Sequence, residues 1–199
     1  HCTPRILEHL KIDETNPNYI LKDGALYNKE LEYLIKVSCD EKQYIMPDSI
    51  VEINAFAFKD CSKLKKIVLG CSFTSWDSEL DITDVFQDCS SLERIDVRVD
   101  NEEFYSIDGV LYERCSCYTG YAWIKYVPRA MRKKVYEIEG DVANKAFASC
   151  KNIQNIKINY SSIIGRDAFI NTAFYNNSHS KDVENLFKRK IISLHLFIN

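Results

Sequence analysis

The chain has 199 residues, a net charge of -3 at neutral pH and a pI near 5.9, so it lacks the basic excess that binding to nucleic acid or to an anionic membrane surface requires. No apolar run approaches the roughly 18–20 residues of a membrane-spanning helix. We therefore expect no nucleic-acid partner and no membrane insertion, in a chain long enough to bury a core of its own.

The first recognisable element is a hairpin at residues 16–27, with Asp23-Gly24 at its turn. Asp-Gly between two apolar runs favours a type I′ turn, because both of its central residues take positive φ. A third apolar run follows at residues 31–35. The sequence therefore predicts a three-stranded β-meander near residues 16–37.

A second pattern begins after this meander and occurs in three full copies, at residues 53–69, 82–97 and 142–158. Counting from a phenylalanine, each copy has Cys three residues on, Leu or Ile six on and Ile nine on. A fourth copy starts at residues 164–169 and then departs from the pattern. The matched residues are Phe58, Cys61, Leu64 and Ile67; Phe86, Cys89, Leu92 and Ile95; and Phe147, Cys150, Ile153 and Ile156.

Each copy predicts one coil of a repeat solenoid. Alternation at its end, as in Ile67 and Leu69 around Val68, is typical of a strand with one buried face. Phe and Cys three residues apart lie on one side of a helical turn. No coil can bury its apolar face alone, so we expect stacked coils that share one core, with Phe58, Phe86 and Phe147 buried.

A second hairpin interrupts these copies at residues 101–112, 85 residues after the first, with Asp108-Gly109 at its turn. The apolar run at 122–128 completes a second predicted meander, near residues 101–128. Between its strands lies an insert rich in cysteine and tyrosine.

Eight cysteines in a chain of this length do not make a disulfide scaffold. The repeat positions of Cys61, Cys89 and Cys150 predict buried free thiols. Cys115 and Cys117 have no zinc spacing, and pairing with Cys39, Cys71 or Cys2 is the stronger alternative. We expect no metal and no cofactor.

The combination of these motifs resembles the BspA-like leucine-rich repeat family over residues 16–174. It comprises Ile-x-x-x-Ala-Phe-x-x-Cys-x-x-Leu-x-x-Ile, the segment Met46-Pro47-Asp48-Ser49-Ile50 and the Asp-Gly hairpins. The resemblance implies an α/β, mostly β, fold: a right-handed leucine-rich-repeat solenoid over residues 1–180 with two inserted meanders. Residues 181–199 are expected to be a tail, a cap or a truncated repeat.

Two groups of residues are candidates for binding. The outward positions of the repeat strands would line up as adjacent rows on one sheet, the kind of surface that solenoids use for binding, or form no more than a solvated face. They are Lys66, Val68, Arg94, Asp96, Arg98, Asn155, Lys157 and Asn159. The aromatic residues Tyr118, Tyr121, Trp123 and Tyr126 would either anchor a partner or pack the meander onto the solenoid.

The resemblance implies a non-enzymatic binding module, cell-surface or secreted, that mediates adhesion or protein–protein interaction. Its expected partner is a protein of the host or matrix, or a glycan, and the chain is expected to be a monomer. The alternatives are a structural spacer and a carbohydrate-binding accessory region. No histidine lies beside a cysteine and no carboxylate pair stands out, so we name no catalytic residue.

Overall fold

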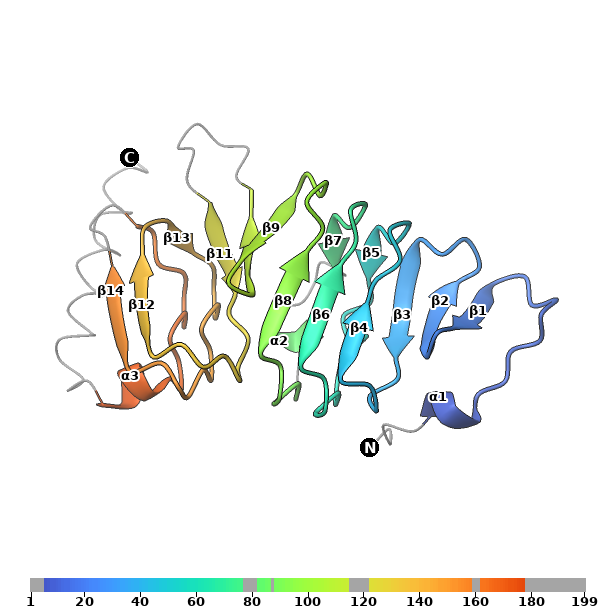
Figure 1. Ribbon diagram of the computed structural model, residues 1–199, viewed down its shortest axis with the longest axis horizontal. Coiled ribbons are helices and arrows are strands. Elements are labelled where there is room, and N and C mark those ends of the chain that lie inside the picture. The colour runs from blue at the N-terminus through green and yellow to red at the C-terminus, as the bar shows by residue number, and fades with distance from the viewer. Residues whose placement is uncertain (1–5, 77–81, 87, 115–121, 159–161, 178–199) are drawn as a thin grey trace.

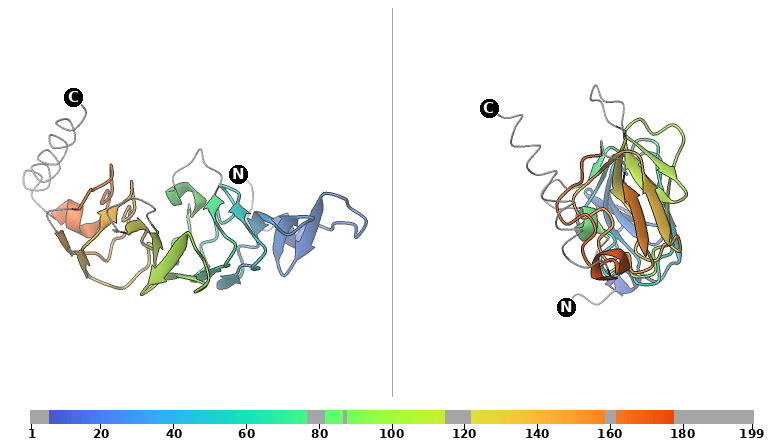
Figure 2. Two further views of the ribbon diagram at one scale, coloured as in Figure 1. Left: turned by 90° about the horizontal axis from the view of Figure 1, so that it is seen from above. Right: turned by 90° about the vertical axis from the view of Figure 1, so that its left-hand side faces the viewer.

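The computed structural model describes residues 6–76, 82–86, 88–114, 122–158 and 162–177. The molecule is elongated, with its strands ranked side by side from one end to the other (Figure 1). Seen from above, the first hairpin projects at one end of this row (Figure 2). No helix among the described residues is long and apolar enough to cross a membrane.

Both predicted meanders are present. Strands β1 (Tyr19–Lys22), β2 (Ala25–Asn28) and β3 (Tyr33–Val37) pair antiparallel in that order. Strands β9 (Phe104–Ile107), β10 (Val110–Glu113) and β11 (Trp123–Tyr126) do the same. The turn residues have φ of 48° and 73° at Asp23 and Gly24, and 54° and 83° at Asp108 and Gly109. The type I′ prediction is therefore confirmed at both turns.

The repeat strands form two parallel ladders on one side of the molecule (Figure 1). Strands β4 (Gln43–Ile45), β6 (Lys66–Leu69) and β8 (Arg94–Val97) make one. Strands β12 (Val135–Ile138) and β14 (Asn155–Ile158) make the other.

The remaining elements are short. Strand β5 (Glu52–Ile53) pairs in parallel with both β3 and β7 (Ser75–Trp76), and β13 (Asp141–Val142) pairs in parallel with β11. The helices among the described residues are α1 (Ile6–His9), α2 (Ile82–Val85) and α3 (Ala173–Asn177).

These pairings show that a whole unit of six strands occurs twice. In the first, the meander β1–β3 leads to the pairs β3–β5 and β4–β6. In the second, β9–β11 leads to β11–β13 and β12–β14. The two units are joined where the second hairpin meets β8: the Ile95 amide donates to the Gly109 carbonyl at 2.9 Å, and the Val97 amide donates to Ser106 Oγ at 3.0 Å.

The repeat phenylalanines form the core, as predicted. Phe58, Phe86 and Phe147 are at most 2% exposed, and Phe169 of the partial fourth copy is equally buried. The described residues form two core clusters, and the strands β10 and β11 contribute to both. Leu111 and Tyr126 belong to the first cluster, whereas Val110 and Ile124 belong to the second.

One turn recurs behind each phenylalanine. The cysteine amide donates to the phenylalanine carbonyl three residues earlier, at 3.1–3.2 Å in the three full copies, and Thr172 does the same in the fourth. The residue just before it has positive φ each time: 67° at Asp60, 64° at Asp88, 64° at Ser149 and 59° at Asn171. Asp, Ser and Asn tolerate this region because their short polar side chains bond locally.

The prediction of free thiols is wrong for Cys61 and confirmed for Cys89 and Cys150. Cys61 is buried but forms a disulfide with Cys39 in the segment before β4. Cys89 and Cys150 are free and buried, and their thiols donate to the Phe58 and Val127 carbonyls at 3.0 and 3.3 Å. Cys2, Cys115 and Cys117 lie outside the described residues.

Burial raises the pKa of the Cys89 and Cys150 thiols to about 12 each. An unfolded thiol ionises near pH 8.5, so both states are protonated below that pH and these thiols add no pH dependence there. Above it the unfolded chain loses protons first, and each thiol should lower the free energy of unfolding by about 1.4 kcal/mol per pH unit up to pH 12. Urea titrations from pH 8 to 11 would measure this slope. The Cys89→Ala/Cys150→Ala variant should reduce it, and an unchanged slope in that variant would contradict the assignment.

Candidate binding surface

The outward face of the first ladder holds the predicted residues in cross-strand rows. Lys66 lies opposite Arg94 and Val68 lies opposite Asp96, because β6 and β8 pair in register. Ile67 and Ile95 point the other way and are fully buried. Strand β4 extends each row, with Gln43 opposite Lys66 and Ile45 opposite Val68. Ile45 is 54% exposed, so this face carries apolar as well as charged groups.

Asp96 connects the two cations of this face. Its Oδ1 accepts from Arg94 at 2.6 Å, and its Oδ2 lies 3.0 Å from Lys66 Nζ. Partial burial acts to raise the pKa of the Asp96 carboxyl, but the hydrogen bonds from Arg94 and Lys66 outweigh it and hold that pKa below its usual value. The three groups therefore form a fixed, half-exposed charge pattern at neutral pH.

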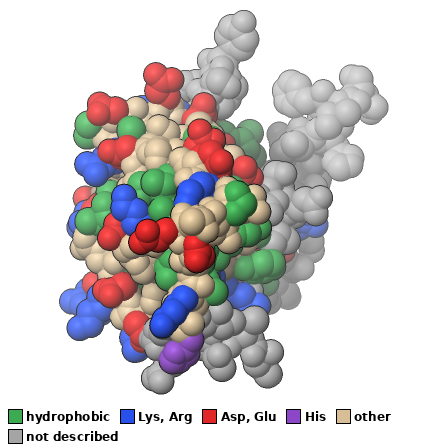
Figure 3. Space-filling view, turned by 90° about the vertical axis from the view of Figure 1, so that its right-hand side faces the viewer, with side chains coloured by type: hydrophobic (Ala, Val, Ile, Leu, Met, Phe, Trp, Pro, Cys, Tyr) green, Lys and Arg blue, Asp and Glu red, His purple; other side chains and the backbone are tan. Residues whose placement is uncertain are grey.

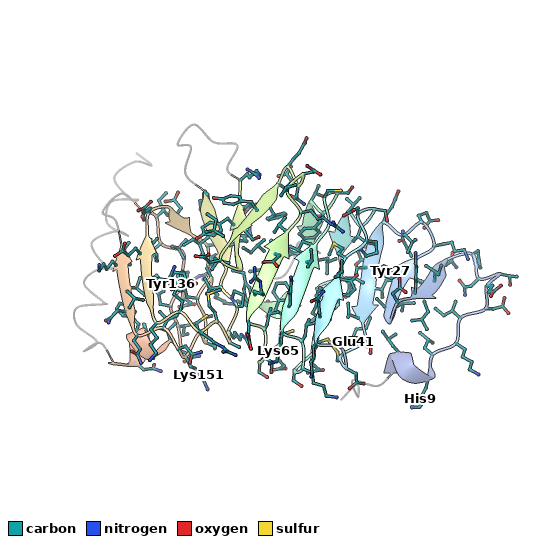
Figure 4. All side chains as sticks on the ribbon, in the orientation of Figure 1. His9, Tyr27, Glu41, Lys65, Tyr136 and Lys151 are labelled. Atoms are coloured by element: carbon teal, nitrogen blue, oxygen red, sulfur yellow. A yellow bond between two sulfur atoms is a disulfide. The ribbon has the colours of Figure 1, made fainter. Side chains whose placement is uncertain are left out.

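Arg98 lies just beyond β8, at the rim of a groove of about 590 Å³. Its Nε is 3.1 Å from Asp48 Oδ1. The groove runs between the tip of hairpin β1–β2 and strand β4, and Tyr27 and Tyr44 are among its lining residues. Their hydroxyls share a hydrogen bond of 2.9 Å, and burial raises the pKa of both. Figure 4 shows Tyr27, on strand β2 of the first hairpin, well separated from Tyr136 of the second unit.

The prediction that all three strand rows share one sheet is wrong. Asn155 and Lys157 lie exposed on β14, whose ladder is separate from that of β6 and β8. Lys157 instead pairs with Glu137 of the neighbouring strand at 2.6 Å. The physical reason is the second meander, which bonds to the edge of β8 and stands between β8 and β12 (Figure 1). Asn159 lies outside the described residues.

The two aromatic candidates that the structure describes, Trp123 and Tyr126, do not form an exposed platform. Tyr126 is 1% exposed and its ring centroid is 4.9 Å from that of Phe86, so of the two alternatives it packs the meander onto the core and is not available to bind a partner. Strand β11 points Ile124 and Tyr126 inward, which leaves Trp123 half-buried against the second core cluster. Tyr118 and Tyr121 lie outside the described residues.

The described residues contain no group of three or more His, Cys, Asp or Glu side chains placed to hold a metal ion. The largest upward pKa shifts belong to buried groups of the core, such as Tyr44, Cys89 and Cys150. Their cause is burial: Cys89 and Cys150 pack the interior, and the Tyr44 hydroxyl bonds to that of Tyr27 beside the groove.

Comparison with protein families matches a model described as the BspA type leucine rich repeat region. The match comprises six copies, over residues 32–120 and 135–193, which is more than half of the chain. The chain belongs to the BspA-type leucine-rich repeat family.

Similar solved structures include two bacterial leucine-rich repeat proteins. A leucine-rich cell surface protein from Faecalibacterium prausnitzii A2-165 has 14% identity and a TM-score of 0.41, over 81% of this chain and 76% of that one. A leucine-rich repeat protein from Eubacterium ventriosum ATCC 27560 has 16% identity and a TM-score of 0.45, over 81% and 51%.

The pneumococcal vaccine antigen PcpA has 15% identity and a TM-score of 0.40, over 78% of this chain and 68% of its own. A comparison with curated proteins found no match.

Two features of this leucine-rich repeat protein were not foreseen from its sequence. Strand β4 was missed, although the alternation of Tyr44 and Met46 around the exposed Ile45 matches that of Ile67 and Leu69 around Val68. The groove beside β4 was missed with it, because its walls combine residues 22–27 and 41–48 with Arg98, 50 residues further along the chain.

Proposed function

We propose that this chain is a non-enzymatic binding module of a cell-surface or secreted protein, and that it holds a protein of the host or matrix on the outward face of β4, β6 and β8. In this proposal the coils are part of a right-handed leucine-rich-repeat solenoid over residues 1–180, and residues 181–199 form its tail or cap. Family membership supports the module, and the charge pattern around Asp96 supports the location.

The observation that carries the location is that Lys66, Arg94 and Asp96 are fixed by ion pairs yet stay partly exposed. Side chains that are already ordered lose little entropy when a partner binds, which favours recognition. The neighbouring Ile45 offers apolar area beside them. Arg98 and the groove next to it lie along the same face and would extend the contact.

The test is binding of the full chain to immobilised matrix proteins, namely fibronectin, fibrinogen, laminin and collagen. We expect one of them to bind, and Arg94→Glu to weaken that binding about tenfold or more, because it reverses one charge and repels Asp96. Lys151→Glu is the matched control: it makes the same charge change at an exposed site on the lower margin of the molecule (Figure 4).

Thermal unfolding should show that both variants stay folded. Binding that Arg94→Glu leaves unchanged would contradict the location of the site. Failure of all four proteins to bind would contradict the proposal and favour a spacer that projects other domains. Binding of a glycan array that is sensitive to Trp123→Ala would favour the carbohydrate alternative instead.

A further inference from the structure

The two units differ in what covers their hairpins. The second hairpin is buried under the coil that precedes it: Gly109 is buried, Phe104 is 3% exposed, and Asn101 is 2% exposed. The equivalent residues of the first hairpin lie 85 residues earlier in the chain. Of these, Gly24 is exposed and Tyr19 is 47% exposed. The first hairpin therefore presents an uncovered version of a surface that is covered in the second.

Asn101 shows what such a surface can bind. Its Oδ1 accepts from the amides of Glu103 and Phe104, which fixes the turn before β9. Its Nδ2 donates to the carbonyls of Gly70 and Phe73 in the preceding coil, at 2.9 and 2.8 Å. The side chain thus ties one coil to the next.

Asn16 fixes its own turn in the same way as Asn101, but among the described residues its Nδ2 group does not make the two hydrogen bonds to another coil. Its Oδ1 accepts from the amides of Asn18 and Tyr19, at 2.9 Å each. In the part of the chain that the structure describes, its Nδ2 has no acceptor comparable to those of Asn101. Asn16 is therefore already oriented to donate to two carbonyls of a coil placed beside it.

The aromatic position repeats this contrast. Phe104 packs against Phe73 and Trp76, with ring centroids 5.2 and 5.4 Å away. Tyr19 takes the place of Phe104 at the free end of the molecule. Figure 3 shows this end, where apolar side chains are interspersed with acidic and basic ones.

The glycines at the two hairpin tips also differ in what lies against them. A Cβ atom at Gly109 would lie 2.5 Å from the Cβ of Arg94, so only glycine allows β8 to approach this closely. At Gly24 the nearest such contact is Ser38 Cβ at 3.7 Å, which leaves room for a strand. The Gly24 carbonyl accepts from the Ser38 amide, whereas the residue equivalent to Ser38 in the second unit is Pro128, which has no amide hydrogen.

The chain also contains a candidate strand for this site. Residues 7–13 align without a gap with residues 92–98, so Leu7 corresponds to Leu92, Leu10 to Ile95 and Ile12 to Val97. In the structure, however, Ile6–His9 is the short helix α1, and the Leu10 amide lies 3.4 Å from the Leu7 carbonyl. A helix of four residues is marginal by itself, so little opposes its rearrangement.

We propose that hairpin β1–β2 with Asn16 is a docking surface for one further leucine-rich-repeat coil, and that residues 7–13 become the strand that joins it. The Leu10 amide would donate to the Gly24 carbonyl, which already accepts from the Ser38 amide and can accept a second hydrogen bond, in the place that Ile95 has at Gly109. Asn16 would donate to two turn carbonyls of the added coil, and Tyr19 would pack against its aromatic residue. Gly24 also lines the groove beside β4, but docking of a coil is measured at Leu10 and does not depend on what the face of β4, β6 and β8 binds.

The test uses an extended chain in which a second copy of residues 16–91 replaces residues 1–6. Its junction then reproduces the native sequence from residue 91 to residue 92. Amide hydrogen exchange is measured at Leu10 in the extended and native chains, with Ile95 as the internal reference. We expect exchange at Leu10 to slow by about 100-fold or more and to approach that of Ile95. Unchanged exchange overturns the proposal, and so does an added unit that fails to fold against the hairpin.

The Asn16→Asp variant provides a second measurement. It keeps the Oδ1 acceptor of the turn but replaces the Nδ2 donor by an oxygen. In the native chain we expect the melting temperature to change by no more than about 1 °C, whereas in the extended chain it should fall by about 4 °C or more. Equal shifts in the two chains would show that Asn16 makes no contact with the added coil.

Discussion

Replacement of Phe58 by alanine is expected to lower the free energy of unfolding by about 3–5 kcal/mol. The Phe58 ring is fully buried, with the rings of Tyr44 and Phe86 5.4 and 5.6 Å away in the neighbouring coils. Removing it leaves a cavity that both neighbours line. Because each ring lies against the ring of the next coil, the loss should affect the contacts on both sides of the substituted coil.

Phe56 is the matched control, since it lies in the same turn and is 46% exposed. Its replacement by alanine should change the free energy of unfolding by about 0.5 kcal/mol or less. Urea denaturation of both variants, followed by far-UV circular dichroism, gives the two values. Equal effects at the two positions would mean that the aromatic stack does not hold the coils together.

The second large effect is expected for Asn101→Asp. Asn101 is 2% exposed and donates from Nδ2 to two carbonyls, so the substitution removes two hydrogen bonds and places a carboxylate against two carbonyl oxygens. A buried charge without a partner costs about 3–5 kcal/mol. The cost should fall at low pH, because protonation removes the charge and restores one donor.

Asn16→Asp in the native chain is the control for this prediction. It makes the same chemical change in the same kind of turn, but within the described residues Asn16 bonds only to its own turn, so we expect about 0.5 kcal/mol or less. Both variants should be compared by urea denaturation at pH 7 and pH 4. A similar loss of unfolding free energy in the two variants would show that the asparagine stabilises its own turn and that the hydrogen bonds of Nδ2 to the preceding coil contribute little.

Much of the fold could be predicted because its signals are local. The positive φ at Asp23-Gly24 and Asp108-Gly109 follows from residue type. The inward direction of Ile67 and Ile95 follows from period-two alternation, and the burial of the repeat phenylalanines follows from the need of each coil for a neighbour.

The errors arose where contacts between distant segments decide the outcome. Cys39 has no repeat position of its own, so nothing in its surroundings marked it as the partner of Cys61. The two alternatives for Tyr126 could not be separated from the sequence, because the contact that decides between them is with the ring of Phe86, 40 residues earlier. The equivalent of Tyr126 in the first unit is Lys36, whose polar character gave no hint of burial.

The binding surface was foreseen only in part for the same reason. The outward positions on β6 and β8 follow from alternation, but the separation of β14 from them depends on where the second meander attaches. That attachment rests on Gly109 and Ser106, which meet β8 from outside its own coil. Such contacts are set by packing between units and leave no periodic pattern in the sequence.

The division of the apolar interior into two clusters has a mechanical consequence. Leu111 and Tyr126 of the second meander belong to the cluster of the first unit, whereas Val110 and Ile124 belong to the cluster of the second. The second meander is therefore shared by both clusters. Under tension along the row of coils, we expect the two units to separate at this meander only after its hydrogen bonds to β8 have broken.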